Sequence, residues 1–567
     1  MIFQQRRNIL LLVLLSGMAA IIFIALFTPL GDPDFFWHLK TGEWLWQHRA
    51  LPAEDPFAHT SAGAVSGRAH LILTSYWLSQ VLYYLFSLVG SLSSLVFLRL
   101  VMIGALLFLL VKRRRGDHLL YFGLLIIFLV VVLRLFPLER PQVFSFLFFA
   151  LLLYLLDAAR DGNYPAKHNV GYILISLSMM LWANLHAGFS TGQALLILYV
   201  CAEGIKFSHM SLRPMERNSY KRLCMAAALG LIASLVNPNT YHVWEVLLHY
   251  RQKIDHLNLD PGYLAGINRD YMSPIQYFVM FRDYGIVLYW FMLLLTVTGV
   301  MIKRRSMNIT ELLLVAGTGF FSFFTLRYVP FFMIAALPVI AEKYEGRVLA
   351  IGRAGILVVA LGAGVSYGLE ARGNLAYVTT GPPVHHFYPA KAADFIIEHD
   401  LRGNMFNTYV WGGYLIWRLA PERKVFVDGR DLFPEITNEA ALVENAVDAS
   451  IAGMPLWKAI LQTRGVEYAV LPLTRSTGTL LPLCVALLDD REWMPVFYDV
   501  NAMIFIRTSR GSREGAEKLA LSPAEVIDGL IGKYDRLREE YPQQASLAVT
   551  QKDLQRIRAG LEASHAY

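Results

Sequence analysis

Long apolar segments, each of roughly 18 to 22 residues, recur through the first two thirds of the chain, and a helix of that length spans a bilayer. Short loops between these segments hold most of the charged residues of this region. The composition agrees, because 55% of the 567 residues are hydrophobic and only 17% are charged. A soluble chain of this length keeps a more highly charged surface. The sequence therefore predicts a polytopic α-helical membrane protein.

The basic residues predict how the chain crosses the membrane. Arg6 and Arg7 precede a first apolar segment that is too long for a signal peptide, so we expect a cytoplasmic N-terminus and a first span. Residues 71–89 mix Ser, Tyr and Gln with apolar residues, as interfacial helices do, so we expect this segment not to cross. Every other basic loop then falls inside, which predicts about eleven spans. Those after the first are residues 93–111, 119–135, 142–158, 169–185, 188–206, 223–237, 285–302, 310–326, 329–341 and 348–366.

We expect three parts in the chain, and the odd number of spans places the residues after the last span outside the cytoplasm. Residues 1–366 form the transmembrane domain, with outside loops at 31–92 and 238–284. Residues 367–507 alternate strand and helix patterns, which predicts an α/β domain outside the cytoplasm. Residues 508–567 are charged and predict a helical tail. Within the α/β domain we expect strands at NMFNTYV, KVFVDGR, YAVLPL, PVFYD and AMIFIR, and a helix near residues 438–463.

The net charge of +7 does not indicate a nucleic-acid partner, because the Lys and Arg residues lie where membrane topology places them. The cysteines, Cys201, Cys224 and Cys484, form no CxxC pair and no zinc-ligand spacing. We therefore expect a lipid bilayer as partner, and neither nucleic acid nor a disulfide within the C-terminal domain.

The first outside loop concentrates acidic residues, histidines and tryptophans: GDPDFFWHLKTGEWLWQHRALPAEDPFAHTSAG. Its carboxylates, Asp34 and Asp55 among them, can bind a divalent cation or act as a general base. Its tryptophans can stack on a sugar or anchor the chain at the membrane interface. The residues alone leave open an ordinary loop with turn-forming Asp-Pro pairs and an aromatic belt.

The pattern Asp-x-x-Trp-His at residues 34–38 resembles the acidic motif of prokaryotic oligosaccharyltransferase catalytic subunits. These belong to the GT-C superfamily of membrane glycosyltransferases, which use polyprenyl-phosphate-linked or polyprenyl-diphosphate-linked sugars and carry in-plane helices in the first outside loop. The resemblance implies that Asp34 is the catalytic, metal-associated carboxylate and that Asp55 assists it. The implied cofactor is Mg²⁺ or Mn²⁺, with Asp270 of the second outside loop as a candidate third ligand.

Longer stretches resemble a bacterial GT-C-like family and, more distantly, protein mannosyltransferases. The resemblance runs from residue 32 to residue 431 and does not reach the tail. It implies the bacterial cytoplasmic membrane, with the C-terminal domain in the periplasm or outside the cell. The stretches are DPDFFWHLKTGEWL, ERPQVFSFL, LWANLHAGFSTG, SLVNPNTY, LRYVPFF and FNTYVWGGYLIWRLAPERKVFVDGRD.

Four polar residues fall at the outer ends of predicted spans, where a lipid-linked donor would place its phosphate. Arg140 and Arg327 can bind phosphate through charge-assisted hydrogen bonds, with His186 and Asn237 beside them. Each has a structural alternative. Glu139 can neutralise Arg140, arginines can snorkel to the interface, His186 can join helices, and Asn237 can end a span before a proline.

The stretch WGGYLIW…KVFVDGR resembles the soluble-domain WWDYG motif of oligosaccharyltransferases. Two glycines, at positions 412 and 413, stand where that motif has an acidic residue, which argues against recognition of a peptide sequon. The alternative is that the glycines permit close packing of a helix on a strand. The candidate functional residues here are Trp411, Tyr414, Asp428 and Arg430.

Three functions remain open. The first is a glycosyltransferase that moves a sugar from a polyprenyl-phosphate-linked donor to a protein, lipid or glycan. The second is a transporter of a lipid-linked sugar, although no internal repeat or interrupted pair of helices indicates one. The third is a non-enzymatic scaffold for envelope assembly, because a fold does not determine a function.

Overall fold

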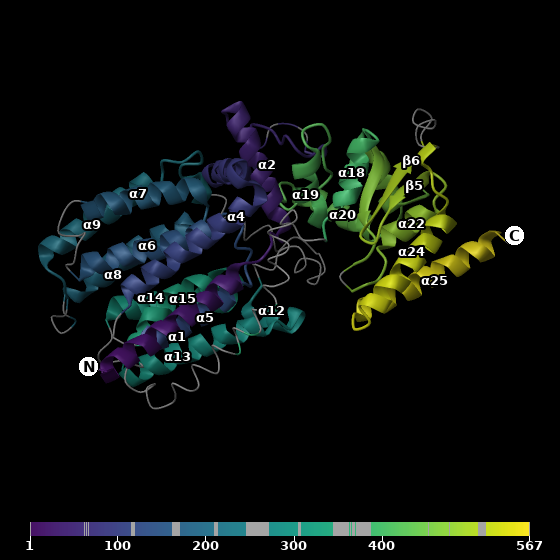
Figure 1. Cartoon of the computed structure of the whole chain (residues 1–567). Helices are drawn as coiled ribbons and strands as arrows, with labels where there is room; N and C mark the ends of the chain where they lie inside the picture. Colours follow the sequence, from purple (N-terminus) through teal and green to yellow (C-terminus); the bar gives the residue numbers. More distant parts are fainter. Residues whose placement is uncertain are drawn as a thin grey trace. The chain divides into compact units, whose positions relative to one another are not determined.

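The computed structural model (Figure 1) divides the chain into two compact units. The helical unit comprises Met1–Asp32, Thr41–Arg49 and Thr74–Val384. The α/β unit comprises Pro33–Lys40, Ala50–Leu73 and His385–Tyr567. The structure describes residues 2–61, 63, 65, 67–114, 119–161, 170–208, 212, 214–244, 272–303, 308–343, 362, 365, 369, 387–451, 453–475, 477–508 and 518–565.

Helices lie at each predicted span up to residue 341, whereas the predicted span 348–366 falls mostly outside the described residues. Within the helical unit, α1 packs against α5, and α13 packs against α5, as Figure 1 shows. The helices of this unit are α1 Ile2–Leu26, α4 Trp77–Arg113, α5 Leu119–Leu133, α6 Gln142–Arg160, α7 Val170–Leu185, α8 Phe189–Lys206, α9 Arg217–Ala233, α12 Pro274–Phe281, α13 Val287–Lys303, α14 Ile309–Phe324 and α15 Val329–Lys343. In the first loop, α2 is Pro33–His48 and α3 is Gly67–Thr74.

The helical unit exposes apolar side chains and buries charged ones. Leu12, Phe97 and Phe320 are 66%, 63% and 61% exposed, whereas Glu203 and Lys206 are buried. Soluble proteins rarely expose apolar surface of this extent, but lipid requires it. By length and composition, three helices among the described residues can cross a membrane: Gly67–Arg113, Gln142–Arg160 and Tyr284–Met301. Four shorter apolar helices accompany them, and the chain is a membrane protein.

The long helix α4 is interrupted where the sequence predicts a boundary between segments 71–89 and 93–111. Gly90 and Ser91 leave helical geometry, with φ of −149° and 57°. The chain therefore forms two helical pieces here, on either side of residues 90–91.

An ion pair and a hydrogen bond join α4, α6 and α8, and a second ion pair lies within α8. Asp157 on α6 accepts from Arg113 on α4 at 2.9 Å and from the Tyr199 hydroxyl on α8 at 2.7 Å. Lys206 pairs with Glu203 at 2.6 Å within the last turn of α8. Charges this deeply buried persist only when they are paired, so these contacts fix the helix ends.

The α/β unit is built on a four-stranded mixed sheet in the order β1-β4-β6-β5. β1 pairs with β4 in parallel, and β6 pairs antiparallel with both β4 and β5. Its elements are α18 Ala390–Glu398, β1 Asn404–Asn407, α19 Tyr409–Leu419, α20 Pro434–Glu444, β2 Ser450–Ile451, β3 Met454–Pro455, α21 Leu456–Thr463, β4 Val466–Pro472, α22 Pro482–Asp489, β5 Trp493–Tyr498, β6 Ala502–Arg507, α24 Pro523–Glu540 and α25 Ala545–His565.

Two sequence expectations for this unit differ from the structure. The expected helix at 438–463 is two helices, α20 and α21, because Gly453 adopts φ +81° in a short hairpin, β2–β3, between them. The expected strand at KVFVDGR joins no sheet ladder of the C-terminal region, and its Val425 forms only an isolated parallel bridge with Ala58. The partner of this segment therefore comes from the first outside loop.

The tail is a helical hairpin of α24 and α25, drawn in yellow in Figure 1. Val526, Ile527 and Leu530 of α24 and Leu554 of α25 are buried in the core of the α/β unit. Ser522 begins α24 with a capping box that it forms with Glu525. The tail is thus part of this unit's hydrophobic core.

Candidate functional site

A segment of the first outside loop is built into the α/β unit. Val425 donates its backbone N–H to the Phe57 carbonyl at 2.9 Å, and the N–H of His59 returns to the Val425 carbonyl at 3.0 Å. The Thr60 hydroxyl donates to the Phe426 carbonyl at 2.6 Å. Residues 57–60, which we call the strap, therefore act as an extra strand beside residues 425–427.

Two polar side chains connect this pair of strands to β1. The amide of Asn407, at the end of β1, donates to the Val427 carbonyl at 2.8 Å and accepts from the Phe426 N–H at 2.8 Å. His59 Nε2 lies 2.9 Å from the Met405 carbonyl, so it carries the proton and donates. Asn407 is fully buried, and sequence reasoning gave it no role.

Arg430 forms the centre of a buried charge cluster. Its guanidinium donates to both carboxylate oxygens of Asp55, at 2.6 and 3.1 Å, and to both of Asp428, at 2.7 Å each. The guanidinium also lies 5.3 Å from the centre of the Phe57 ring. The two carboxylates raise the pKa of Arg430 against the opposing effect of burial. Three of the predicted site residues thus lie together, joined as an ion cluster.

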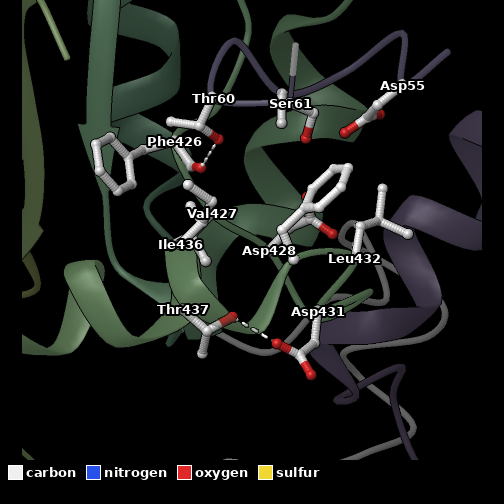
Figure 2. Close-up of a pocket in the computed structure, with 12 residues that line it drawn as sticks. Asp55, Thr60, Ser61, Phe426, Val427, Asp428, Asp431, Leu432, Ile436 and Thr437 are labelled. Carbon is white, nitrogen blue, oxygen red and sulfur yellow. Dashed lines mark hydrogen bonds between the residues drawn. The ribbon is translucent and has the colours of Figure 1, made fainter. Parts of the chain in front are cut away.

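A small cavity borders this cluster, and Figure 2 shows the residues around it. Its volume is about 20 Å³, which is room for a single water molecule. Asp55 and Asp428 line it, together with Asp431, whose carboxylate accepts from the Thr437 hydroxyl at 2.6 Å. Arg68 also pairs with Asp431, at 2.8 Å. The cavity is too small for a sugar, and the strap residues Ala58 and Thr60 form part of its wall.

Asp34 lies at the same turn as the cluster. It occupies the first turn of α2, after Pro33 at the first helical position. A Cβ built on Gly429 would overlap the Asp34 carboxylate, so this glycine lets the carboxylate approach the backbone of the turn. The structure therefore brings the motif around Asp34 to the VDGR stretch, although the two lie far apart in the sequence.

Two further glycines permit the same close packing. A Cβ on Gly413 would overlap the Pro33 carbonyl, and a Cβ on Gly412 would overlap the backbone of Val427. An acidic side chain at either position has no room in this packing. The two glycines therefore permit α19 to pack closely against its neighbours, as in the packing alternative that the sequence offered.

The aromatic residues of the WGGY motif are packed in the core. Tyr414 is buried, stacks on Tyr388 with ring centres 5.0 Å apart, and meets the edge of Phe36 at 5.2 Å. Its hydroxyl accepts from Arg418 at 3.1 Å, and burial raises the pKa of Tyr414. Trp411 is also buried. Both residues hold α19 in place.

In the helical unit, Arg140 is neutralised by Asp32, and not by Glu139 as the sequence suggested. Its Nε and Nη2 donate to the two carboxylate oxygens of Asp32, at 2.8 and 2.9 Å. Glu139 instead pairs with Arg99, at 2.5 Å. Arg99 lies inside α4 and also donates to the Thr28 carbonyl. A charged residue within an apolar span was the sequence signal for Arg99.

His186 joins helix ends of the same unit. Its Nδ1 accepts from the Gly188 N–H at 3.0 Å, which leaves its proton on Nε2. Ser145 lies 2.6 Å from the same nitrogen, and Trp182 donates to the Ser145 hydroxyl at 2.7 Å. Arg327 lies in a short 3-10 helix, Leu326–Tyr328, between α14 and α15, and its charge acts on His186.

Asn237 lies just after the end of α9. Its amide donates to the Ser234 carbonyl at 2.7 Å, and its side-chain oxygen accepts from the N–H of Asn239 at 2.8 Å. Asn239 in turn accepts from the Thr74 hydroxyl at 3.0 Å. These contacts place Asn237 in the loop after α9, and its role as a donor-binding residue stays a prediction. Asp270 lies outside the described residues.

The carboxylates of Asp32 and Asp55 are not arranged as ligands for a divalent cation. Both oxygens of Asp55 accept from Arg430, and those of Asp32 accept from Arg140. Within the part of the chain that the structure describes, no group of three His, Cys, Asp or Glu side chains is placed to hold a metal ion. We therefore derive no step through a metal.

Comparison with known proteins yields a fold. No protein-family model and no curated protein sequence matches the chain. The oligosaccharyltransferase of Archaeoglobus fulgidus in complex with Zn and sulfate aligns with 87% of this chain and 73% of its own, at TM-score 0.53 and 11% identity. The apo form of the same enzyme aligns with 88% of this chain and 75% of its own, at TM-score 0.51 and 11% identity. The chain is similar in fold to these two structures.

Proposed function

We propose that the chain is a membrane glycosyltransferase that moves a sugar from a polyprenyl-phosphate-linked donor to a protein, lipid or glycan acceptor. The observation that carries the proposal is the position of Asp34 against Gly429. Three closely packed glycines bring the α2 N-terminus to the VDGR turn and fix this carboxylate. Similarity in fold to the oligosaccharyltransferase structures gives independent support.

Asp34 is suited to act as the general base. It lies in the first turn of α2, where the helix N-terminus stabilises a negative charge. In the reaction, an acceptor O–H or N–H gives its proton to the Asp34 carboxylate as the acceptor atom bonds to the anomeric carbon. The bond from that carbon to the phosphate oxygen breaks, and the lipid phosphate leaves with its electron pair.

The reaction would take place outside the cytoplasm. Residues 50–73 and 385–567 belong to one compact unit, and the strap's hydrogen bonds run through its interior. Both must therefore lie on the same side of the membrane, which requires an even number of crossings between them. The ten spans predicted between them meet this requirement. Arg6 and Arg7 before the first span favour a cytoplasmic N-terminus, which gives an extracytoplasmic first loop and C-terminal domain, in a bacterial cytoplasmic membrane.

A non-enzymatic scaffold is the second candidate. It is favoured by the use of Asp55, Asp428 and Arg430 in one buried ion cluster, as a purely structural role requires. Under this alternative Asp34 would contribute to packing alone.

The test is sugar transfer in membranes that contain a radiolabelled pool of polyprenyl-phosphate sugars. Wild type should incorporate label into an acceptor, and Asp34→Asn should not. Asp400→Asn is the matched control, because the Asp400 side chain is 57% exposed and pairs with Arg402 and Arg423. Equal incorporation by wild type and Asp34→Asn would exclude Asp34 as the base, and no incorporation by wild type across the donor pool would favour the scaffold.

A further inference from the structure

A second, larger cavity lies within the helical unit. Its volume is about 190 Å³, and a water molecule occupies about 30 Å³ of liquid, so it has room for a phosphate group. It is bordered by the end of α1, by Arg99 of α4 and by the loop after α5. Charged and polar residues provide much of the border: Thr28, Asp32, Arg99, Arg134 and Glu139.

Arg99 is the principal reason to expect a ligand. It is only 3% exposed, and a cation inside an apolar helix is costly unless it has a use. Its two terminal nitrogens are occupied by Glu139 and by the Thr28 carbonyl. Its remaining donor, Nε, has no hydrogen-bond acceptor among the described residues. A buried donor of this kind calls for an acceptor from a ligand or from water.

The charges around the cavity favour an anion. Arg134 lies close enough to Arg99 for the two positive charges to repel. Of the acids, Glu139 is paired with Arg99, and Asp32 is paired with Arg140. A phosphate between Arg99 and Arg134 would relieve this repulsion and accept their hydrogen bonds.

We propose that this cavity binds a phosphate group through Arg99 and Arg134, with arginine and not a metal ion supplying the positive charge. The carboxylates on its border are held by arginine, so they are not arranged as ligands for a cation. The proposal deepens the proposed function, on which its lipid-linked ligand rests, whereas the phosphate chemistry stands on the cavity itself.

The test measures binding to the purified full chain by titration calorimetry in EDTA and again in Mg²⁺. The probes are inorganic phosphate, a short-chain prenyl monophosphate and the corresponding prenol. The prenyl monophosphate should bind equally well in EDTA and in Mg²⁺, and the prenol should not bind. Tighter binding of the prenyl compound than of inorganic phosphate identifies a lipid headgroup, and equal binding identifies a free phosphate; both support the site.

Two variants test the residues. Arg134→Gln should weaken phosphate binding about tenfold or more, because a hydrogen bond to a charged group is lost. The pair Arg99→Gln and Glu139→Gln removes both members of a buried ion pair, so it leaves no uncompensated charge, and it should weaken binding similarly. Arg402→Gln, at an 81% exposed position of the α/β unit, is the control and should bind as wild type.

Two results would overturn the proposal: phosphate binding that disappears in EDTA, or affinity unchanged in folded Arg134→Gln and in the double variant. The proposed function fails separately. Phosphate binding without sugar transfer would disprove the transferase and leave this site in place. Sugar transfer without phosphate binding in EDTA would disprove the phosphate site and leave the transferase in place.

Discussion

Arg430 and Asp55 form a two-point ion pair, at 2.6 and 3.1 Å, although 375 residues separate them in the sequence. Both side chains are completely buried. The pair joins the first outside loop to the C-terminal region, next to the strap. A buried pair of this kind is strongly destabilising when one member is removed, because the other remains buried and uncompensated.

The two members should not be equivalent on substitution. Arg430→Gln leaves the carboxylates of Asp55 and Asp428 buried without their cation, and we expect it to cost about 3–5 kcal/mol of stability. Asp55→Asn leaves Arg430 paired with Asp428 and should cost less. Thermal unfolding of the purified chain measures both. Equal losses would contradict a cluster in which one arginine serves two carboxylates.

The contact between Gly429 and Asp34 predicts a destabilising substitution that a second change relieves. Gly429→Ala places a methyl group on the Asp34 carboxylate and should cost about 1–3 kcal/mol through overpacking. Adding Asp34→Ala removes the overlapping atoms and should restore most of the stability without restoring sugar transfer. Gly532→Ala is the control, since a Cβ there meets nothing. A double variant no more stable than Gly429→Ala would show that the overlap is not the cause.

The strap should weaken on acidification. Burial lowers the pKa of His59 below its ordinary value of 6.5, with Arg464 and Lys424 acting in the same direction and the hydrogen bond to Met405 opposing them. The unfolded chain therefore binds more protons than the folded chain as pH falls below about 6.5, so stability is lost from there down to the lowered pKa. We expect His59→Gln to reduce the loss of melting temperature between about pH 7 and pH 5. An identical loss in wild type and variant would exclude His59 as the source.

The pair of Arg140 and Asp32 should show measurable coupling. Its geometry is two-point, at 2.8 and 2.9 Å, and Asp32 is buried. A double-mutant cycle with Arg140→Gln and Asp32→Asn should give an interaction energy within about 0.5–3 kcal/mol, as expected for contacting charges. The free energy of unfolding in mixed detergent supplies the four values. Strict additivity would mean that Arg140 is free for a donor phosphate, as the sequence suggested.

The helices of the membrane unit could be predicted from the sequence, because each corresponds to a continuous run of apolar residues. Contacts between residues far apart in the sequence have no comparable local pattern, so they could not be predicted in this way. Residues 424–430 have a strand pattern, but the pattern cannot say that the neighbouring strand is residues 57–60 and not β1. Asp55 and Arg430 were both identified as candidates, yet nothing local shows that they neutralise one another.

The glycines at 412, 413 and 429 illustrate the same limit. Sequence reasoning identified the first two as a departure from an acidic motif, and it offered close packing as the alternative. Only the fold shows what they pack against: the Pro33 carbonyl and the Val427 backbone. Arg99 was accessible to sequence reasoning, because a lone arginine within residues 93–111 contradicts the apolar pattern around it.

The central claim is that Asp34 is the base of a sugar-transfer reaction. The most direct measurement is kcat/KM for transfer from a defined polyprenyl-phosphate sugar by the purified chain, comparing wild type, Asp34→Asn and Asp400→Asn at equal melting temperature. Loss of a positioned base should lower kcat by about 10²- to 10⁴-fold in Asp34→Asn alone. An unchanged kcat in a folded Asp34→Asn variant would contradict the account.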